Sequence, residues 1–192
     1  MKKENIASLV RKQNFEEKIK LDDLPEIDLY MDQVIQLFEN SLSNMKRNEE
    51  DKVLTKTMIN NYAKAKLLMK INNKKYSKDH LILMSLIYEL KGALSINDIK
   101  LLLDNIVSKY DNGEEYDVRK LYSSYLNICD DESEFTKKHL IEKLDTVFEG
   151  KQDEELTYEE KFLLISTVVS MSNIYRRMAE TLIDNFFAKG EE

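Results

Sequence analysis

Glycine and proline are scarce in this chain, which contains four glycines and one proline among 192 residues. Multi-stranded sandwiches and barrels need many tight turns, and such turns depend on these two residue types. A glycine-rich loop that cradles a phosphate group is excluded for the same reason. The scarcity therefore predicts an all-α fold.

The single cysteine, Cys129, excludes an intrachain disulfide and a thiolate zinc cluster, and it suits a reducing compartment. The first 20 residues lack an apolar run of signal-peptide length. The most apolar stretch, Leu81 to Leu90, already contains Ser85 and Glu89, and it is much shorter than the roughly 20 apolar residues of a membrane span. We expect a cytoplasmic protein without a membrane partner.

Apolar residues at helical spacing, together with capping signals, predict several helices along the chain. They are expected at residues 4–19, 25–44, 55–68, 77–92, 95–110, 115–129, 133–148 and 157–189. The tripeptide Asp111-Asn112-Gly113 favours a turn, and the composition changes after it. We therefore expect an N-terminal helical extension at residues 1–23, a first domain at 24–110 and a C-terminal helical bundle at 111–192.

The net charge of −7 is an average over three unlike regions of the chain. Residues 1–51 carry −4 and residues 79–192 carry −11, whereas residues 52–78 carry eight lysines and no acidic residue. An acidic protein normally repels nucleic acid, but a local charge of +8 attracts phosphate. The basic window is therefore the candidate binding surface.

Within this window, polar side chains share one side of the helix predicted from Thr55. Lysine can contact phosphate, and the hydroxyl and amide groups of threonine and asparagine can bond base edges in a major groove. One alternative is a solvated lysine face that serves only solubility. A second alternative is a protein-interaction module whose lysines bind an acidic protein partner.

A family resemblance begins at the same residues. The passage from Leu54 to Tyr62 (LTKTMINNY), then Lys66-Leu67-Leu68 and the passage from Lys75 to Leu81 (KYSKDHL), resembles the recognition helix, wing and next helix of MerR-type regulators. The passage from Leu94 to Leu102 (LSINDIKLL) is similar to that family's following helix. From Leu24-Pro25 through that helix, the chain more closely resembles a YkrK-like family of bacterial proteins labelled as a domain of unknown function.

The resemblance implies a winged helix-turn-helix domain at residues 24–110, with at most a short β wing, that binds double-stranded DNA and regulates transcription. It implies that the helix from Thr55 enters the groove and that Lys74, Lys75 and Tyr76 lie on the wing. The predicted DNA-binding residues are Thr55, Lys56, Thr57, Asn60, Asn61, Lys64, Lys66, Lys74, Lys75 and Tyr76.

The last predicted helix carries an apolar seam in which steps of four and three residues alternate, as in a coiled coil. The seam consists of Leu164, Val168, Met171, Tyr175, Met178 and Leu182. It can pair two chains, or it can pack on the two preceding helices of the same chain. We favour a homodimer, because groove-reading domains usually read two half-sites.

Catalytic and metal-binding signals are weak. His80 and His139 belong to no recognisable nucleophile arrangement, and we expect capping or surface roles for them. The acidic runs at residues 130–134 and 153–155 lack the spacing of a calcium loop. We interpret these runs as charges at helix starts. We expect no enzyme activity, metal or cofactor, and the sequence identifies no small-molecule effector.

Overall fold

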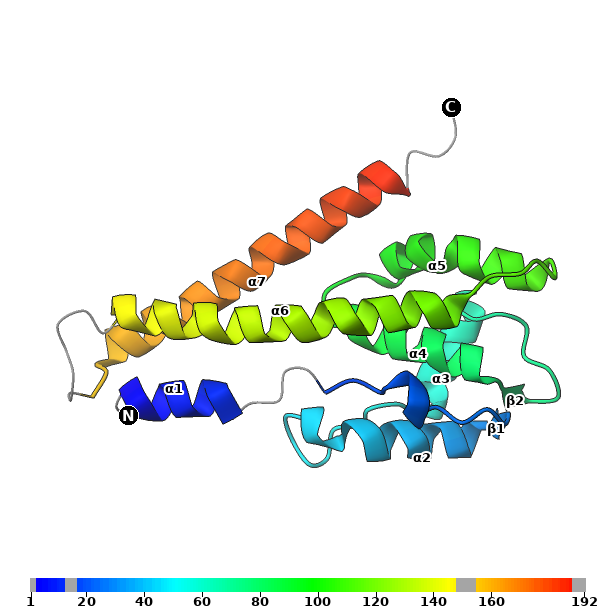
Figure 1. The fold of residues 1–192 in the computed structure, drawn as a ribbon, viewed down its shortest axis with the longest axis horizontal. Helices are drawn as coiled ribbons and strands as arrows, with labels where there is room; N and C mark the ends of the chain where they lie inside the picture. The colour runs from blue at the N-terminus through cyan, green and yellow to red at the C-terminus, as the bar shows by residue number, and fades with distance from the viewer. Residues whose placement is uncertain (1–2, 13–16, 148–154, 188–192) are drawn as a thin grey trace. The chain divides into compact units, whose positions relative to one another are not determined.

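A computed structural model of the chain describes residues 3–12, 17–147 and 155–187 (Figure 1). Within these residues the chain is mostly helical, which confirms the predicted class, and it contains two short strands. The helices are α1 (Lys3–Lys12), α2 (Met31–Leu42), α3 (Lys56–Lys64), α4 (Lys78–Leu90), α5 (Ile96–Asp111), α6 (Val118–Val147) and α7 (Tyr158–Phe186). The strands β1 (Leu29–Tyr30) and β2 (Lys75–Tyr76) pair antiparallel, with Leu29 opposite Tyr76.

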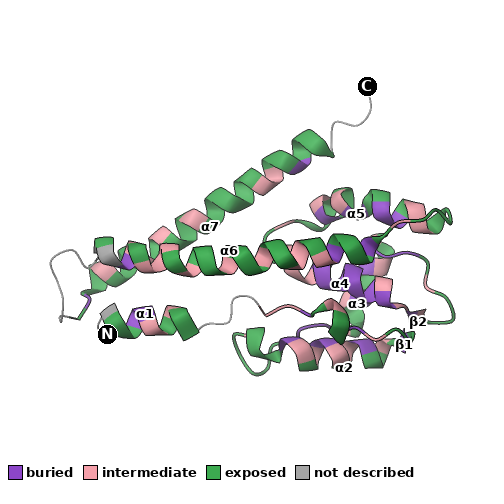
Figure 2. Cartoon of the chain, in the orientation of Figure 1, coloured by how far each residue is buried: buried purple, intermediate pink, exposed green. Residues whose placement is uncertain are grey.

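The chain divides into two compact units, which we call the core unit (residues 17–126 and 179–192) and the helical unit (residues 1–16 and 127–178). In the core unit, α4 is buried on almost all sides, as its apolar sequence predicts (Figure 2). Val118 and Tyr122 of α6 belong to the same core. This core therefore continues beyond the turn at residues 111–113, where we predicted a domain boundary.

The start of α2 differs from the prediction, which placed a helix from Pro25 onward. Leu24 has an extended backbone (φ −84°, ψ 121°), as is usual before proline, and the helix begins only at Met31. The Tyr30 amide donates a hydrogen bond to the Gln33 side chain at 2.9 Å. Pairing with β2 holds Leu29 and Tyr30 extended, so a contact with a distant segment overrides the local helix signal.

The prediction of two separate helices at residues 115–129 and 133–148 is also wrong. Helix α6 is continuous from Val118 to Val147, and the acidic run at residues 130–134 lies in its interior. These charges therefore do not mark a helix start. The segment contains no proline or glycine, and charged residues on an exposed helix surface do not break it. Residues 153 and 154 of the second acidic run lie outside the described residues.

Two other expectations concern membranes and metals. No helix within the described ranges is long and apolar enough to cross a membrane. In the same ranges, no group of three or more histidine, cysteine, aspartate or glutamate side chains is arranged to hold a metal ion.

Helix α4 begins with a capping arrangement in which His80 takes the place that glutamate or glutamine usually occupies. The Ser77 amide donates a hydrogen bond to His80 Nδ1 at 3.2 Å, and Ser77 Oγ lies 2.8 Å from the same nitrogen. His80 is buried, and its ring meets the ring of Tyr76 edge-on, with 5.9 Å between the ring centroids. The predicted capping role of His80 is confirmed, and this role needs an unprotonated Nδ1.

We expect His80 to make the fold less stable in acid. Burial lowers the pKa of His80 below its ordinary value of 6.5, against opposing contributions that include the carboxylates of Asp79 and Asp28. The unfolded chain therefore takes up this proton before the folded chain does. The free energy of unfolding should fall as the pH drops below about 6.5, and this loss should level off below the lowered pKa.

Urea denaturation of the wild type and of His80→Gln between pH 5 and pH 8 checks this expectation. Glutamine keeps an acceptor for the Ser77 amide but does not titrate. The free energy of unfolding of the wild type, relative to that of His80→Gln, should therefore increase as the pH rises toward 6.5. A difference that is the same at every pH would contradict the assignment.

Candidate nucleic-acid interface

Helix α3 has one buried side and one exposed polar side. Thr55 caps its start, because the Thr55 hydroxyl accepts a hydrogen bond from the Met58 amide at 3.2 Å. Ile59 and Tyr62 are buried in the core. The exposed residues stand three or four positions apart, so they form one stripe along the helix. The stripe comprises Thr57, Asn60, Asn61 and Lys64, with Lys56 also exposed at the first turn.

Helix α3 is shorter than predicted, with nine residues instead of about fourteen. Lys66 adopts a left-handed backbone (φ 58°). The Lys66 amide donates to the Ala63 carbonyl at 3.1 Å, and the Leu67 amide donates to the Tyr62 carbonyl at 3.0 Å. These two bonds form the Schellman motif that ends many helices, here with lysine where glycine is usual. Lys66 is therefore exposed at the end of α3 and does not continue it.

The segment between α3 and α4 contains a tight turn at residues 72–75. Asn73 and Lys74 both have positive φ (51° and 59°), and the Lys75 amide donates to the Asn72 carbonyl at 2.9 Å. This pattern is that of a type I′ hairpin turn, for which asparagine can replace glycine. Strand β2 follows this turn, but its partner is the distant β1, and across the turn itself there is only an isolated bridge between Asn72 and Lys75.

The four predicted DNA-binding residues that follow α3 differ in how far they are exposed. Lys66 and Lys74 are exposed, and Lys75 is half-buried with its Nζ 5.1 Å from the centre of the Tyr30 ring. Tyr76 is only 3% exposed and packs in the core. A residue so deeply buried cannot reach a nucleic acid without unfolding, so the predicted contact of Tyr76 is wrong. Its alternation with Lys75 on a strand explains the difference, because neighbouring strand residues point to opposite faces.

Acidic side chains from distant parts of the sequence reach the basic window. Lys56 Nζ lies 2.8 Å from Asp32 Oδ1 of α2, and both side chains are well exposed. Lys78 is buried and forms a 2.7 Å ion pair with Glu26. The sequence pattern did not reveal these pairs, because 24 and 52 positions separate their partners. Two of the eight lysines are therefore paired within the chain. The exposed pair contributes little to stability, since solvent screens it.

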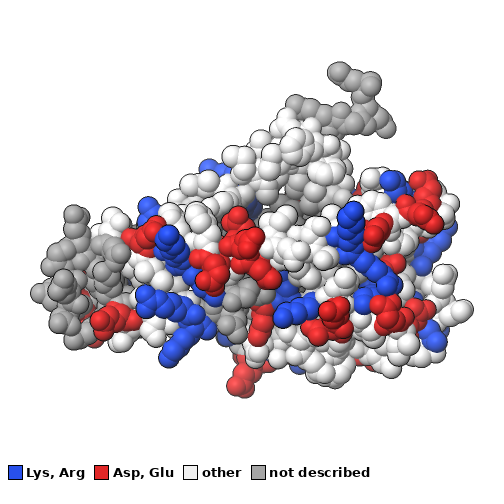
Figure 3. Space-filling view, viewed as in Figure 1, with Lys and Arg blue, Asp and Glu red and all other residues white. Residues whose placement is uncertain are grey.

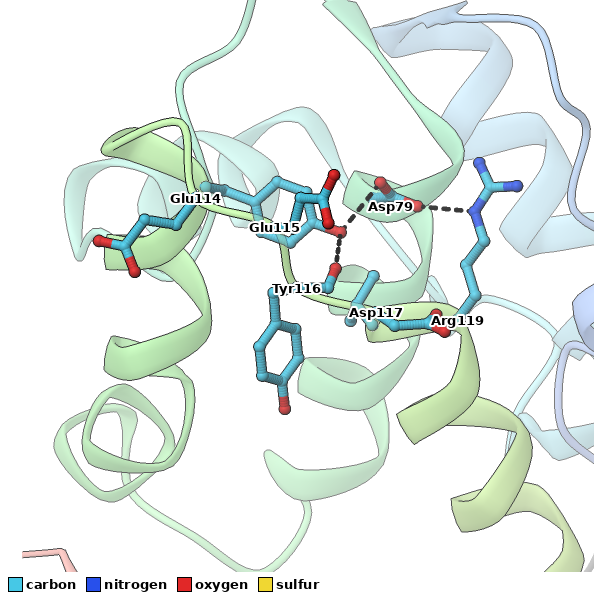
Figure 4. Close-up of a pocket in the computed structure, with 8 residues that line it drawn as sticks. Asp79, Glu114, Glu115, Tyr116, Asp117 and Arg119 are labelled. Atoms are coloured by element: carbon cyan, nitrogen blue, oxygen red, sulfur yellow. Dashed lines mark hydrogen bonds and ion pairs between the residues drawn. The ribbon is translucent and has the colours of Figure 1, made fainter.

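Sequence reasoning also missed a polar cluster in the core unit (Figure 4). The cluster lines a cavity of about 670 Å³, and its lining residues include Asp79, Tyr110, Tyr116 and Arg119. Arg119 Nε donates to Asp79 Oδ1 at 3.1 Å, and the Tyr110 hydroxyl lies 3.1 Å from Asp79 Oδ2. Burial, followed by the charge of Asp79, raises the pKa of Tyr110 to about 12.

The Arg119 side chain extends this cluster to Glu26, with Nη1 at 3.0 Å from Glu26 Oε2. Hydrogen bonding from Lys78, and then from Arg119, holds the pKa of Glu26 below its ordinary value despite an opposing contribution from burial. The network therefore ties the segment before β1 to the starts of α4 and α6. Because its central carboxylate already has two partners within the chain, we assign it a structural role.

The apolar seam of α7 is split between two environments. Leu164 and Met171 are half-buried, whereas Val168, Tyr175, Met178 and Leu182 are exposed. Packing within the chain therefore covers part of the seam and leaves the rest at the surface.

Comparison with known protein families assigns most of the core unit to one family. The profile of a family described as a domain of unknown function, DUF1836, matches residues 19–125. The match covers more than half of the chain, and it runs from the segment before β1 into the first part of α6. Neither the curated proteins nor the solved structures include a significant match. The chain thus belongs to the DUF1836 family of domains of unknown function.

Proposed function

We propose that this protein is a bacterial transcription regulator that binds double-stranded DNA through α3. In this proposal the core unit acts as a winged helix-turn-helix domain of the MerR type, as the resemblance to MerR-type and YkrK-like proteins implies. The protein works by binding in the cytoplasm and has no catalytic activity of its own.

The observation that supports this proposal most is the exposed stripe of α3. Thr57, Asn60, Asn61 and Lys64 present hydroxyl, amide and ammonium groups on one side, while Ile59 and Tyr62 anchor the opposite side in the core. No acidic residue lies between positions 52 and 78. On the face drawn in Figure 3, by contrast, basic and acidic side chains are intermixed. The ammonium group of this stripe is suited to binding phosphate, and its hydroxyl and amide groups are suited to binding base edges.

The dimensions of α3 also suit a groove. The diameter of an α-helix with its side chains, about 10–12 Å, fits the roughly 12 Å width of the major groove, and the nine residues of α3 extend about 13 Å along it. In this proposal Thr57, Asn60 and Asn61 discriminate bases, while Thr55 serves mainly to start the helix. Lys64, Lys66, Lys74 and Lys75, and also Lys56 in exchange for its exposed ion pair with Asp32, supply attraction to phosphates that is independent of sequence.

The proposal predicts a steep dependence of DNA affinity on salt. If about five lysines displace counterions from the duplex, the logarithm of the affinity should fall with the logarithm of the salt concentration at a slope of about −4.5 per chain. Fluorescence anisotropy with a labelled random-sequence duplex, measured across a range of salt concentrations, determines this slope.

An acidic polypeptide serves as the competitor that separates DNA binding from the alternative. A protein-interaction surface that merely prefers negative charge would release the duplex to a polyglutamate chain of equal charge. A DNA-binding surface should retain the duplex under the same conditions. The absence of any duplex binding at low salt would refute the proposal.

A further inference from the structure

A segment of α7 in the helical unit has an unusual composition for a protein surface. Residues 162–175 contain no charged side chain, although 34% of the whole chain is charged. The part of α7 that is visible in Figure 3 is accordingly almost free of basic and acidic colour. Many apolar side chains of this segment are nevertheless exposed. Such a surface is typical of an interface with another protein.

Seven large apolar side chains of this segment are exposed, and five of them form a stripe beside the seam, while Leu163 and Ile174 lie on another side of the helix. Leu164 and Met171, which are half-buried, face their own chain, and Leu164 packs on the small core of the helical unit. The neighbouring positions at spacings of three and four residues form the exposed stripe. The stripe consists of Phe162 (59% exposed), Ile165 (64%), Val168 (40%), Val169 (53%) and Tyr175 (68%).

The helical unit has little core of its own to compensate for this exposure. Among its described residues, the buried apolar cluster contains only Ile6, Ala7, Leu144 and Leu156. A unit with so few buried side chains gains little stability from burial and benefits from an additional surface to pack against. The exposed stripe on α7 supplies such a surface.

The available area agrees with a second copy of the chain as the occupant. Five large apolar side chains, each about half exposed, offer on the order of 500 Å² per chain and about 1,000 Å² for two chains, which reaches the lower limit of specific interfaces. Around a twofold axis, the stripe of one chain can pack against the same stripe of a second chain.

Charges at the two ends of the segment determine the direction of such a pairing. Glu159, Glu160 and Lys161 precede the uncharged segment with a net charge of −1, and Arg176 and Arg177 follow it with a charge of +2. In a parallel pair, like charges would meet at both ends. In an antiparallel pair, the acidic end of each helix lies beside the basic end of the other.

We propose that the protein forms an antiparallel homodimer through the exposed stripe of α7. This inference is independent of DNA binding, because it rests on the helical unit alone. It commits the exposed seam residues Val168 and Tyr175 to a contact between chains, and the half-buried seam residues Leu164 and Met171 to packing within a chain.

The oligomeric state in solution tests the surface. Light scattering after size-exclusion chromatography should show a dimer for the full wild-type chain at micromolar concentration. The double variant Val168→Glu/Tyr175→Glu should be a monomer, because it places four carboxylates in the paired interface. The control Ser170→Glu adds a carboxylate at an exposed position that is not three or four residues from any stripe residue, and it should remain a dimer, whereas the matched single variant Val168→Glu should be a monomer.

Circular dichroism confirms that each variant is folded, which we expect because all three substituted positions are exposed. A wild-type monomer would overturn the proposal. A dimer that survives Val168→Glu/Tyr175→Glu while folded would overturn it as well.

Distances between spin labels test the direction. In a Cys129→Ser background, one label is placed at Ser166→Cys and, in a second protein, at Glu159→Cys. In an antiparallel dimer, each residue further from the twofold axis adds twice the 1.5 Å helical rise, so the axial separation should be about 21 Å larger at position 159. Equal separations at the two positions would show parallel helices and refute the antiparallel arrangement.

Discussion

Reversing the charges of Lys56 and Lys64 is expected to weaken the binding of duplex DNA by about 100-fold at low salt, roughly tenfold for each reversed lysine. Both side chains are exposed on α3, one in the first turn and one in the last. The variant Lys56→Glu/Lys64→Glu removes two phosphate contacts and adds two charges that repel the duplex. Fluorescence anisotropy under the conditions of the salt titration measures the change.

The neutral variant Lys56→Gln/Lys64→Gln separates loss of contact from repulsion. It should change the salt slope by about 0.9 for each lysine removed, which leaves a slope near −2.7. The matched control is Lys100→Glu/Lys120→Glu, which makes the same change of net charge at exposed positions of α5 and α6. If this control weakens binding as strongly as Lys56→Glu/Lys64→Glu does, the effect reflects total charge, and α3 is not the interface.

Replacing Phe38 by alanine should lower the free energy of unfolding by about 3–5 kcal/mol. Phe38 lies on the inner side of α2 and is 0% exposed, so its removal leaves a cavity in the core unit. Domains of this size are typically stable by only about 5–15 kcal/mol, so the variant should be unfolded in a substantial fraction or have a much reduced midpoint. Urea denaturation followed by circular dichroism measures the loss.

A matched control is Ile27→Ala, which also shortens an apolar side chain but at a position that is 70% exposed. Its effect should stay within about 0.5 kcal/mol, because little apolar surface returns to water. If Phe38→Ala costs no more than Ile27→Ala, then α2 does not pack as described. In that case α2 cannot position α3 for a groove.

Local sequence signals predicted the helices whose ends are formed by neighbouring residues. Thr55 at α3, Ser77 at α4 and Ser95 at α5 cap their helices as expected, and the continuously apolar α4 lies at the centre of the core. Each of these features depends on hydrogen bonds or periodicity within a few residues. Such features can be read without knowledge of the fold.

The errors arose where distant segments meet. Pro25 signalled a helix start, but strand pairing with Tyr76 keeps Leu29 and Tyr30 extended. The error at Lys66 is of another kind, because the hydrogen bonds that end α3 are local but place a lysine in the left-handed position where glycine is the usual signal. Tyr76 followed two lysines in the sequence but points into the core. None of these outcomes has a signal in the local pattern.

In the candidate interface, too, local features could be predicted from the sequence and contacts with distant segments could not. Sequence spacing identified the stripe of Thr57, Asn60, Asn61 and Lys64, because residues three and four apart on a helix share a side. It did not identify the ion pairs of Lys56 with Asp32 and of Lys78 with Glu26, whose partners lie on other segments. The local charge of the basic surface is therefore lower than the sequence count of +8.

The sequence by itself determined that this protein is helical, because so few glycines and prolines cannot build a large sheet. It also determined which side of α3 is polar. Only the tertiary structure decided which lysines remain available to a partner and which side of α7 stays uncovered. Both outcomes depend on contacts between residues that are far apart in the chain, and the physical reason is that ion pairing and burial act through space.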